Sequence, residues 1–205
     1  VATSTIESRP SLPSFLYIAP EHEAASGALG LPWQREMPLA VGEYARRRGA
    51  EMPDRTVAAA KSWLCHSGVD RRQPLLPEHA PPEVTKISPV AASRRYLEHL
   101  VAAWNAKFPD APLAQQQVVL TVPASFDAAA RELTREAAIA AGLPESLVFL
   151  EEPQAAVYSW LVARGDAWRR DLSEGDRLLV CDVGGGTTDL TLIDVAEANG
   201  GLELR

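Results

Sequence analysis

Cysteine is scarce in this chain of 205 residues, which contains only Cys65 and Cys181. The two lie far apart and form no Cys-x-x-Cys pair, so neither a disulfide framework nor a cysteine-based zinc site is indicated. The four histidines have no metal-ligand spacing with these cysteines. We therefore expect two buried, free thiols in a reducing compartment.

Long apolar runs and an excess of basic charge are also lacking. No stretch approaches the roughly 18 consecutive apolar residues that a membrane-spanning helix needs, and no signal peptide is visible. The formal net charge is −7, which argues against a broad basic surface for nucleic acid. We expect a cytoplasmic protein that binds neither membranes nor nucleic acids.

Apolar residues make up 46% of the chain, enough to build the core of one large or two small domains. The glycine- and proline-rich segment over 20–38 predicts a loop or an irregular hairpin, and the prolines over 66–87 predict a loop with at most short strands. Asp54 and Asp127 are predicted helix N-caps, and Ser88 followed by Pro89 is typical of a helix start. The chain is predicted to have strands over 14–19, 37–41, 117–122, 147–150 and, as a hairpin, 178–195, and helices over 42–48, 55–65, 88–107, 128–141 and 153–164. This alternation predicts an α/β fold.

The most informative segment is LLVCDVGGGTTDLTLIDV, residues 178–195. Its apolar runs flank three glycines, Gly184, Gly185 and Gly186, and predict a strand, a tight turn and a second strand. Glycines allow positive φ and a close approach of the backbone to a ligand. Successive N–H groups in such a turn can bind an anion, and Thr187 adds a hydroxyl.

Two carboxylates flank this turn. Asp182 precedes the glycines and Asp189 follows them, so a divalent cation or its water shell could be held beside a bound polyphosphate. No lysine follows the glycines, which excludes a GxxxxGK[ST] loop, and the strand-like sequence that follows excludes a dinucleotide loop opening a helix. The alternative is a plain tight hairpin whose shoulders are acidic.

Four segments resemble one family when they are taken in order. They are RTVAAAKSWL (55–64), VVLTVPASFDAAARELTREAAIAAGL (118–143), FLEEPQAAV (149–157) and CDVGGGTTDL (181–190). Their order and spacing resemble the nucleotide-binding domain of the 70-kDa heat-shock (DnaK-type) chaperones, which belong to the actin-like ATPase superfamily. The resemblance covers essentially the whole chain and is weakest across 20–50 and 66–90.

The resemblance implies a partial actin-like ATPase (ribonuclease H-like) fold, with a first lobe and the start of a second. Residues 1–13 and 93–172 would form the core subdomain of the first lobe. Residues 14–92 would form its outer subdomain. Residues 173–205 would begin the core subdomain of the second lobe, which is incomplete here.

The resemblance also implies functional residues. The GGGT segment would contact the β- and γ-phosphates of ATP or ADP. Asp182 and Asp189 would hold the water shell of Mg²⁺ or orient the attacking water. Lys61 matches the family's catalytic lysine, Glu152 matches its glutamate near the metal, and Pro123 matches a proline linked to signalling between the lobes.

The chain also departs from the family pattern. The family's first phosphate loop would precede Val1, and its adenosine-binding segments and peptide-binding domain would follow Arg205. We therefore expect an internal fragment with no appreciable ATPase activity of its own. Thr188, Ser125 and Gln154 differ from the commonest family residues.

Two functions fit this pattern. The first is the ATP-hydrolysing domain of a chaperone whose partners are unfolded client polypeptides and co-chaperones. The second is a nucleotide-gated interaction module or a filament-forming actin-like relative without chaperone activity. An open strand edge near the C-terminus is also a candidate surface for a homodimer.

Overall fold

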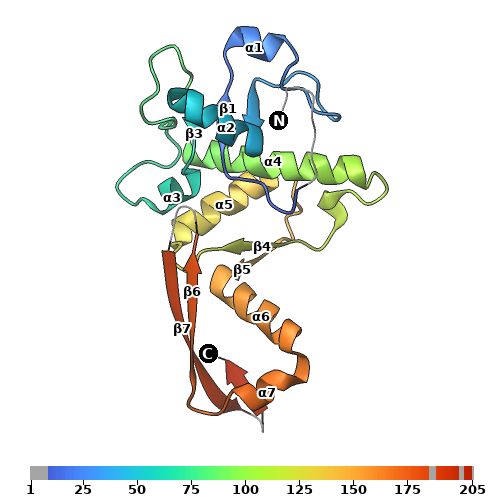
Figure 1. Cartoon of the computed structure of the whole chain (residues 1–205), viewed down its shortest axis with the longest axis vertical. Helices are drawn as coiled ribbons and strands as arrows, with labels where there is room; N and C mark the ends of the chain where they lie inside the picture. The colour runs from blue at the N-terminus through green and yellow to red at the C-terminus, as the bar shows by residue number, and fades with distance from the viewer. Residues whose placement is uncertain (1–8, 185–187, 199–200, 205) are drawn as a thin grey trace. The chain divides into compact units, whose positions relative to one another are not determined.

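The computed structural model describes residues 9–184, 188–198 and 201–204. The chain divides into two compact units (Figure 1). Val1–Val118 and Asp127–Leu147 make up the first unit, and Val119–Phe126 and Val148–Arg205 make up the second. Both units mix helices and strands, as the predicted α/β class requires.

The first unit contains a small antiparallel sheet and a set of helices. The strands β1 (Leu16–Ile18), β2 (Leu39–Val41) and β3 (Thr56–Val57) pair in the order β2-β1-β3. The helices are α1 (Glu21–Ala25), α2 (Glu43–Glu51), α3 (Ala60–Cys65), α4 (Pro89–Lys107) and α5 (Ala128–Ala140), with the 3₁₀ turns η1 (Pro53–Arg55) and η2 (Leu113–Gln115). The sheet strand β1 and the helices α3 and α5 all contact α4.

The two long helices begin where the sequence predicts. The Ser88 side chain accepts a hydrogen bond from the N–H of Ala91 at 3.0 Å, and Pro89 occupies the first helical turn of α4. Asp127 caps α5 in the same way, through the N–H of Ala130 at 2.6 Å. The buried residues of α5 recur at helical spacing and form one apolar face. They are Ala130, Leu133, Thr134, Ala137 and Ala138.

The core of the first unit is built around β1. Leu16 and Tyr17 are both 0% exposed, although successive residues of a strand point to opposite faces. Each face therefore has its own apolar cluster. The first cluster consists of Leu16, Val41, Val57, Ala60, Leu76 and Ala92, and the second of Leu29, Met37 and Ala40.

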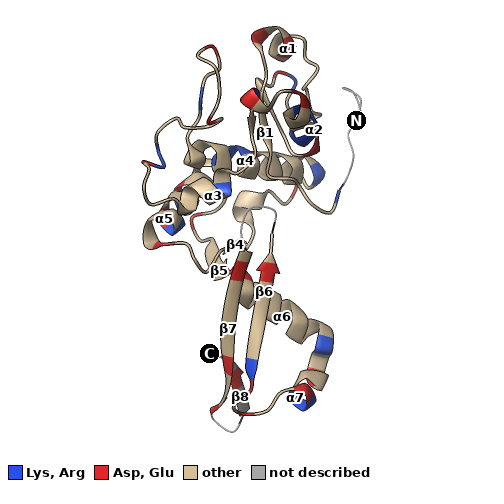
Figure 2. Cartoon of the chain, turned by 60° about the vertical axis from the view of Figure 1, so that its left-hand side comes forward, with Lys and Arg blue, Asp and Glu red and all other residues tan. Residues whose placement is uncertain are grey.

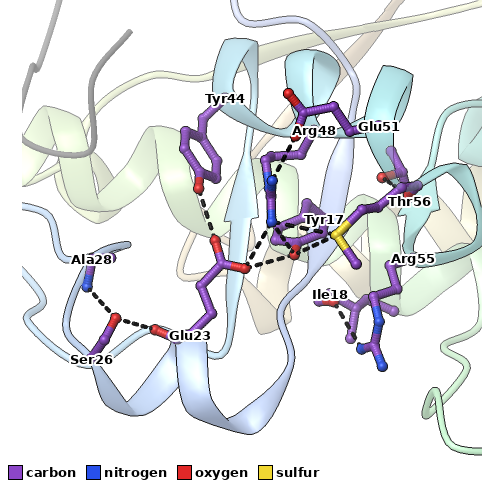
Figure 3. Close-up of polar contacts among 11 residues, drawn as sticks. Tyr17, Ile18, Glu23, Ser26, Ala28, Tyr44, Arg48, Glu51, Arg55 and Thr56 are labelled. Carbon is purple, nitrogen blue, oxygen red and sulfur yellow. Dashed lines mark hydrogen bonds and ion pairs between the residues drawn. The ribbon is translucent and has the colours of Figure 1, made fainter.

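A polar network ties α1 and α2 to β1 (Figure 3). The hydroxyl groups of Tyr17 and Tyr44 donate to the two oxygens of the Glu23 carboxylate, at 2.7 and 2.8 Å. Arg48 Nη2 lies 3.1 Å from both Glu23 Oε2 and the Tyr17 hydroxyl. The neighbouring residues Arg46 and Arg47 are exposed to solvent and form ion pairs with Glu43. Of these three arginines, Arg48 belongs to the network.

The charges in this network stabilise one another. Burial opposes ionisation of Glu23, but the hydrogen bonds from Tyr17, Tyr44 and Arg48 outweigh it and lower the pKa of the carboxyl. Burial and the bond to Glu23 raise the pKa of Tyr44 to about 12. The network is therefore held by a carboxylate with neutral phenols and a guanidinium at neutral pH.

The long segment between α3 and α4 is anchored on α5 by Arg71. The Arg71 guanidinium, in a residue only 8% exposed, makes two parallel hydrogen bonds to the Asp127 carboxylate, at 2.9 and 2.8 Å. Next to it, Arg72 Nη1 donates to Glu136 at 2.6 Å. These contacts fix a segment that has little regular structure of its own.

The second unit contains two separate sheets. The strands β4 (Val119–Val122) and β5 (Val148–Glu151) pair in parallel, with Val122 beside Glu151. The strands β6 (Arg177–Val183), β7 (Thr188–Ala198) and β8 (Gly201–Leu204) form an antiparallel sheet. The helix α6 (Glu152–Arg164) follows β5 directly and contacts β6, and then come the 3₁₀ turn η3 (Gly165–Ala167) and α7 (Trp168–Asp171).

The β6–β7 hairpin carries apolar residues on both of its faces. The more covered face has Leu178 opposite Ile193, which is 7% exposed. The uncovered face has Leu179 opposite Leu192, at 58% and 64% exposed. The predicted hairpin is confirmed, but antiparallel sheets more often alternate apolar and polar residues.

Some local predictions are wrong. The predicted helix over 55–65 forms only over Ala60–Cys65, because Thr56 and Val57 pair with β1 as a strand. Asp54 lies in a 3₁₀ turn and does not cap a helix. The segment over 20–38, predicted as a loop or an irregular hairpin, contains the short helix α1, which has no buried residue and therefore no apolar periodicity to reveal it.

The expectation of two buried thiols is also wrong. Cys65 is half-buried at the end of α3, and Cys181 is exposed. Cys181 lies opposite Leu190 on the uncovered face of the hairpin. The apolar sequence around Cys181 predicts the strand correctly, but it does not reveal which face of the strand is covered.

Candidate functional site

Two carboxylates face each other across the β6–β7 hairpin, at the end that leads into the glycine-rich turn. The antiparallel register pairs Asp182 with Asp189 on the more covered face, and both residues are half-buried. Figure 2 shows acidic residues on both strands at this end of the hairpin. Like charges directly opposite in an antiparallel pair destabilise it, so this arrangement favours a cation between or beside the two groups.

The bonding of Asp189 fits such a cation. Its Oδ1 accepts a hydrogen bond from Ser125, whereas its Oδ2 is buried and has no hydrogen-bond partner among the described residues. A buried carboxylate oxygen without a partner is costly unless a ligand or water satisfies it. The described residues contain no group of three or more His, Cys, Asp or Glu side chains placed to hold a metal ion. Two carboxylates suit Mg²⁺, which keeps several waters and is completed by phosphate oxygens.

A second group of residues lies at the carboxyl edge of the parallel β4–β5 pair. Pro123 follows β4 and Glu152 follows β5, and the register places Val122 beside Glu151 just before them. Ligands of α/β proteins commonly bind outside the carboxyl ends of parallel strands. Glu152 is half-buried in the first turn of α6, where a negative charge is favoured by the helix dipole.

Ser125 links these two groups. It lies two residues after Pro123, and its hydroxyl donates to Asp189 Oδ1 over 3.1 Å. The second unit thereby brings the turn after β4 together with the hairpin. The motif pattern did not identify Ser125 as a site residue, because it stands 64 positions away from Asp189 in the sequence. Its place in the turn after the predicted strand over 117–122 was the available signal.

The remaining predicted site residues belong to the glycine-rich segment and to the first unit. Gly184 is exposed at the end of β6, whereas Gly185, Gly186 and Thr187 lie outside the described residues. Lys61 belongs to the first unit, where it is exposed in the first turn of α3.

The chain thus combines an α/β fold with two facing carboxylates on the strands that flank a glycine-rich segment. The family follows from comparison with known proteins. A family model described as "Hsp70 protein" matches residues 33–205, and the chain belongs to this family. The resemblance seen in the four sequence segments is thereby confirmed.

Family membership supports a fragment of a chaperone nucleotide-binding domain. It implies ATP or ADP, with Mg²⁺, as ligands of the full-length protein. Among the helices in the described part of the chain, none has both the length and the apolar character needed to cross a membrane.

Proposed function

We propose that this chain is part of the ATP-binding and ATP-hydrolysing domain of a cytoplasmic 70-kDa heat-shock-like chaperone. The observation that carries this proposal is the pair Asp182 and Asp189, which face each other at the base of the GGGT turn. Membership of the Hsp70 family supports the same assignment. Client polypeptides and co-chaperones would be partners of the full-length protein.

The proposal includes an actin-like ATPase fold and its subdomains. Residues 1–13 and 93–172 would form the core of the first lobe, residues 14–92 its outer subdomain, and residues 173–205 the beginning of the second lobe. The antiparallel β6–β7–β8 sheet supports the last assignment, because it follows the polar segment over 165–176 as a separate sheet. Nucleotide-dependent closure of the lobes would be the output of such a domain.

Each proposed site residue has a role that its chemistry can perform. When bound, Mg²⁺ supplies positive charge that neutralises phosphate oxygens. Asp182 and Asp189 would hold it, directly or through water, and the backbone N–H groups of the GGGT turn, Gly184, Gly185, Gly186 and Thr187, would bind the β- and γ-phosphates. Lys61 would neutralise charge that develops on the transferred phosphoryl group.

The same carboxylates can orient the attacking water. Phosphoryl transfer to water needs positioning and charge neutralisation more than covalent help. Glu152 and Asp182 both belong to the second unit and would accept hydrogen bonds from that water, acting as weak bases at most. Slow turnover would suit a switch whose product is a conformational state.

A lysine substitution tests this assignment. In the full-length protein, Lys61→Ala should lower the ATP turnover number on the order of 100-fold, because a preorganised positive group is lost from the transition state. Nucleotide should still bind, since the GGGT turn and Asp182 remain. Single-turnover hydrolysis and equilibrium binding of a fluorescent ADP analogue measure the two quantities.

The matched control is Lys107→Ala, which removes an exposed lysine near the end of α4. This variant should hydrolyse ATP at the wild-type rate. Wild-type turnover by Lys61→Ala would contradict the proposed catalytic role. Asp182→Asn should also lower the ATP turnover number. In this variant, the affinity for nucleotide should depend less on Mg²⁺ than it does in the wild type.

A further inference from the structure

Ser125 is held in place by the turn that follows β4. The N–H of Phe126 donates to the carbonyl of Pro123 at 3.2 Å and closes a tight turn around it. The side chains on both sides of this turn are buried, with Pro123 below 2% exposed and Phe126 6% exposed. Ser125 itself is exposed, so its hydroxyl projects from a firmly anchored piece of backbone.

The partner of this hydroxyl is one of the two facing carboxylates. Ser125 Oγ lies 3.1 Å from Asp189 Oδ1, while Asp189 Oδ2 is buried with no partner in the described part of the chain. One oxygen of the carboxylate is thus held by the Ser125 hydroxyl, and the other is available to bind a cation. Asp182 lies directly opposite in the register.

We propose that Ser125 is a positioning residue for metal binding. By holding Asp189 Oδ1, its hydroxyl restricts the rotation of the carboxylate and presents Oδ2, together with Asp182, to the Mg²⁺ that accompanies the nucleotide. This inference rests on the proposed function. Loss of an outer hydrogen bond to a metal ligand typically weakens metal binding about 10- to 100-fold, and we expect the lower end here because Ser125 is exposed.

The hydrogen bond could instead serve only to attach the hairpin to the turn after β4. These two roles predict different measurements. A positioning role affects the metal dependence of nucleotide binding, whereas an attachment role lowers stability and affects nucleotide binding equally with and without metal. The comparison of Ser125→Thr with Ser125→Val separates them, because the two side chains have nearly the same shape and differ by a hydroxyl.

The experiment measures the binding of a fluorescent ADP analogue to the full-length protein while Mg²⁺ is titrated. Ser125→Val should raise the Mg²⁺ concentration needed for half-maximal tightening of ADP binding by about 10-fold. Its ADP affinity in EDTA should equal that of the wild type. Ser125→Thr should restore the wild-type Mg²⁺ dependence, and Ser125→Ala replaces Ser125→Val if the latter does not fold.

A second readout needs no nucleotide. Electron paramagnetic resonance of Mn²⁺, used as a stand-in for Mg²⁺, should show weaker binding to Ser125→Val than to Ser125→Thr. In an Asp189→Asn background, the Ser125 substitution should have no further effect, because the group that it positions is gone.

Several results would overturn the inference. Identical Mg²⁺ dependence of the Val and Thr variants would show that the hydroxyl does not position a metal ligand. Equal weakening in EDTA and in Mg²⁺ would leave only the attachment role. If the wild type binds ADP in an Mg²⁺-dependent manner in these cases, the proposed function survives. Failure of the wild type to bind ADP at any Mg²⁺ concentration would overturn both.

Discussion

Asp127 combines two roles in one side chain. It caps α5 through the N–H of Ala130, and it receives both arms of the Arg71 guanidinium. The hydrogen bonds from Arg71, followed by the bond from Ala130, lower the pKa of Asp127 from 3.8 to about 2. Ionisation of Asp127 is therefore more favourable in the folded protein than in the unfolded chain.

This shift makes the contribution of Asp127 dependent on pH. Folding lowers the pKa of Asp127. The stabilisation by its carboxylate is therefore fully present above pH 3.8 and is lost as the pH falls towards about 2. Asp127→Asn should therefore be less stable than the wild type at pH 6, and this difference should shrink as the pH falls below 3.8. The urea unfolding midpoints of both proteins, measured from about pH 3 to about pH 6, give this difference in stability.

The control for this prediction is Asp110→Asn, an exposed aspartate that forms no ion pair with the described residues. It should show no comparable pH-dependent difference. A difference for Asp127→Asn that stays constant across this pH range would contradict the role of the Arg71 pair and leave only the cap.

The sequence predicts half of this arrangement. A cap is local, so Asp127 could be identified from the residues that follow it. Its partner Arg71 stands 56 positions away, and nothing in the local pattern connects the two. The same limit applies to Ser125 and to Arg48, whose partners are also distant in the sequence.

Helix α4 shows how a local signal determines an element. Removal of the cap in Ser88→Ala should lower the free energy of unfolding by about 1 kcal/mol, because the N–H of Ala91 loses its acceptor. Chemical denaturation followed by circular dichroism measures this change. Ser88→Asn should retain most of the stability, since asparagine caps helices equally well.

A serine inside the same helix provides the control. The Ser93 hydroxyl donates to the carbonyl of Pro89 within the helix, a bond that brings no cap. Ser93→Ala should be neutral or slightly stabilising, because alanine has the higher helix propensity. Equal losses in the two alanine variants would argue against the capping role of Ser88.

Elements without such signals were predicted less well. The segment over 55–65 has a helical composition, but the pairing of Thr56 and Val57 with β1 removes its first turn from the helix. Tertiary pairing overrides local preference here, as it does wherever a short strand completes a sheet. Helices with long apolar faces, such as α5, were predicted to within one residue.

For the whole chain, the division into two units has consequences for stability. The apolar clusters around β1 consist of residues from the first unit only. Leu16→Ala should lower the free energy of unfolding by about 2–5 kcal/mol, the usual range for a fully buried leucine. Hydrogen exchange should show the earliest loss of protection in β1, β2 and β3.

A surface leucine is the matched control. Leu192 is 64% exposed, so Leu192→Ala should change the free energy of unfolding by less than about 0.5 kcal/mol. If Leu16→Ala exposed the amides of β6 and β7 as early as those of β1, the two units would have to unfold as one.

The sequence was most informative about the family and least informative about distant contacts. Four motif segments in the right order are enough to identify the Hsp70 family, since each reflects a local chemical requirement. The assignment of Lys61, Glu152 and Asp182 to one catalytic group stays a prediction. The spacing of these residues in the sequence carries no information about their distances in space.

The apolar residues on both faces of the β6–β7 hairpin affect how its register is specified. Normally a slip by one residue moves the apolar set into water, and this penalty fixes the pairing. Here such a slip would replace Leu178 by Leu179 on the covered face, with little change in hydrophobic burial. Hydrophobic burial alone therefore does not fix the register that places Asp182 opposite Asp189. A chain that slipped by one residue would keep most of its hydrophobic burial and lose the alignment of the two carboxylates, so the candidate site depends on a register that its apolar residues do little to protect.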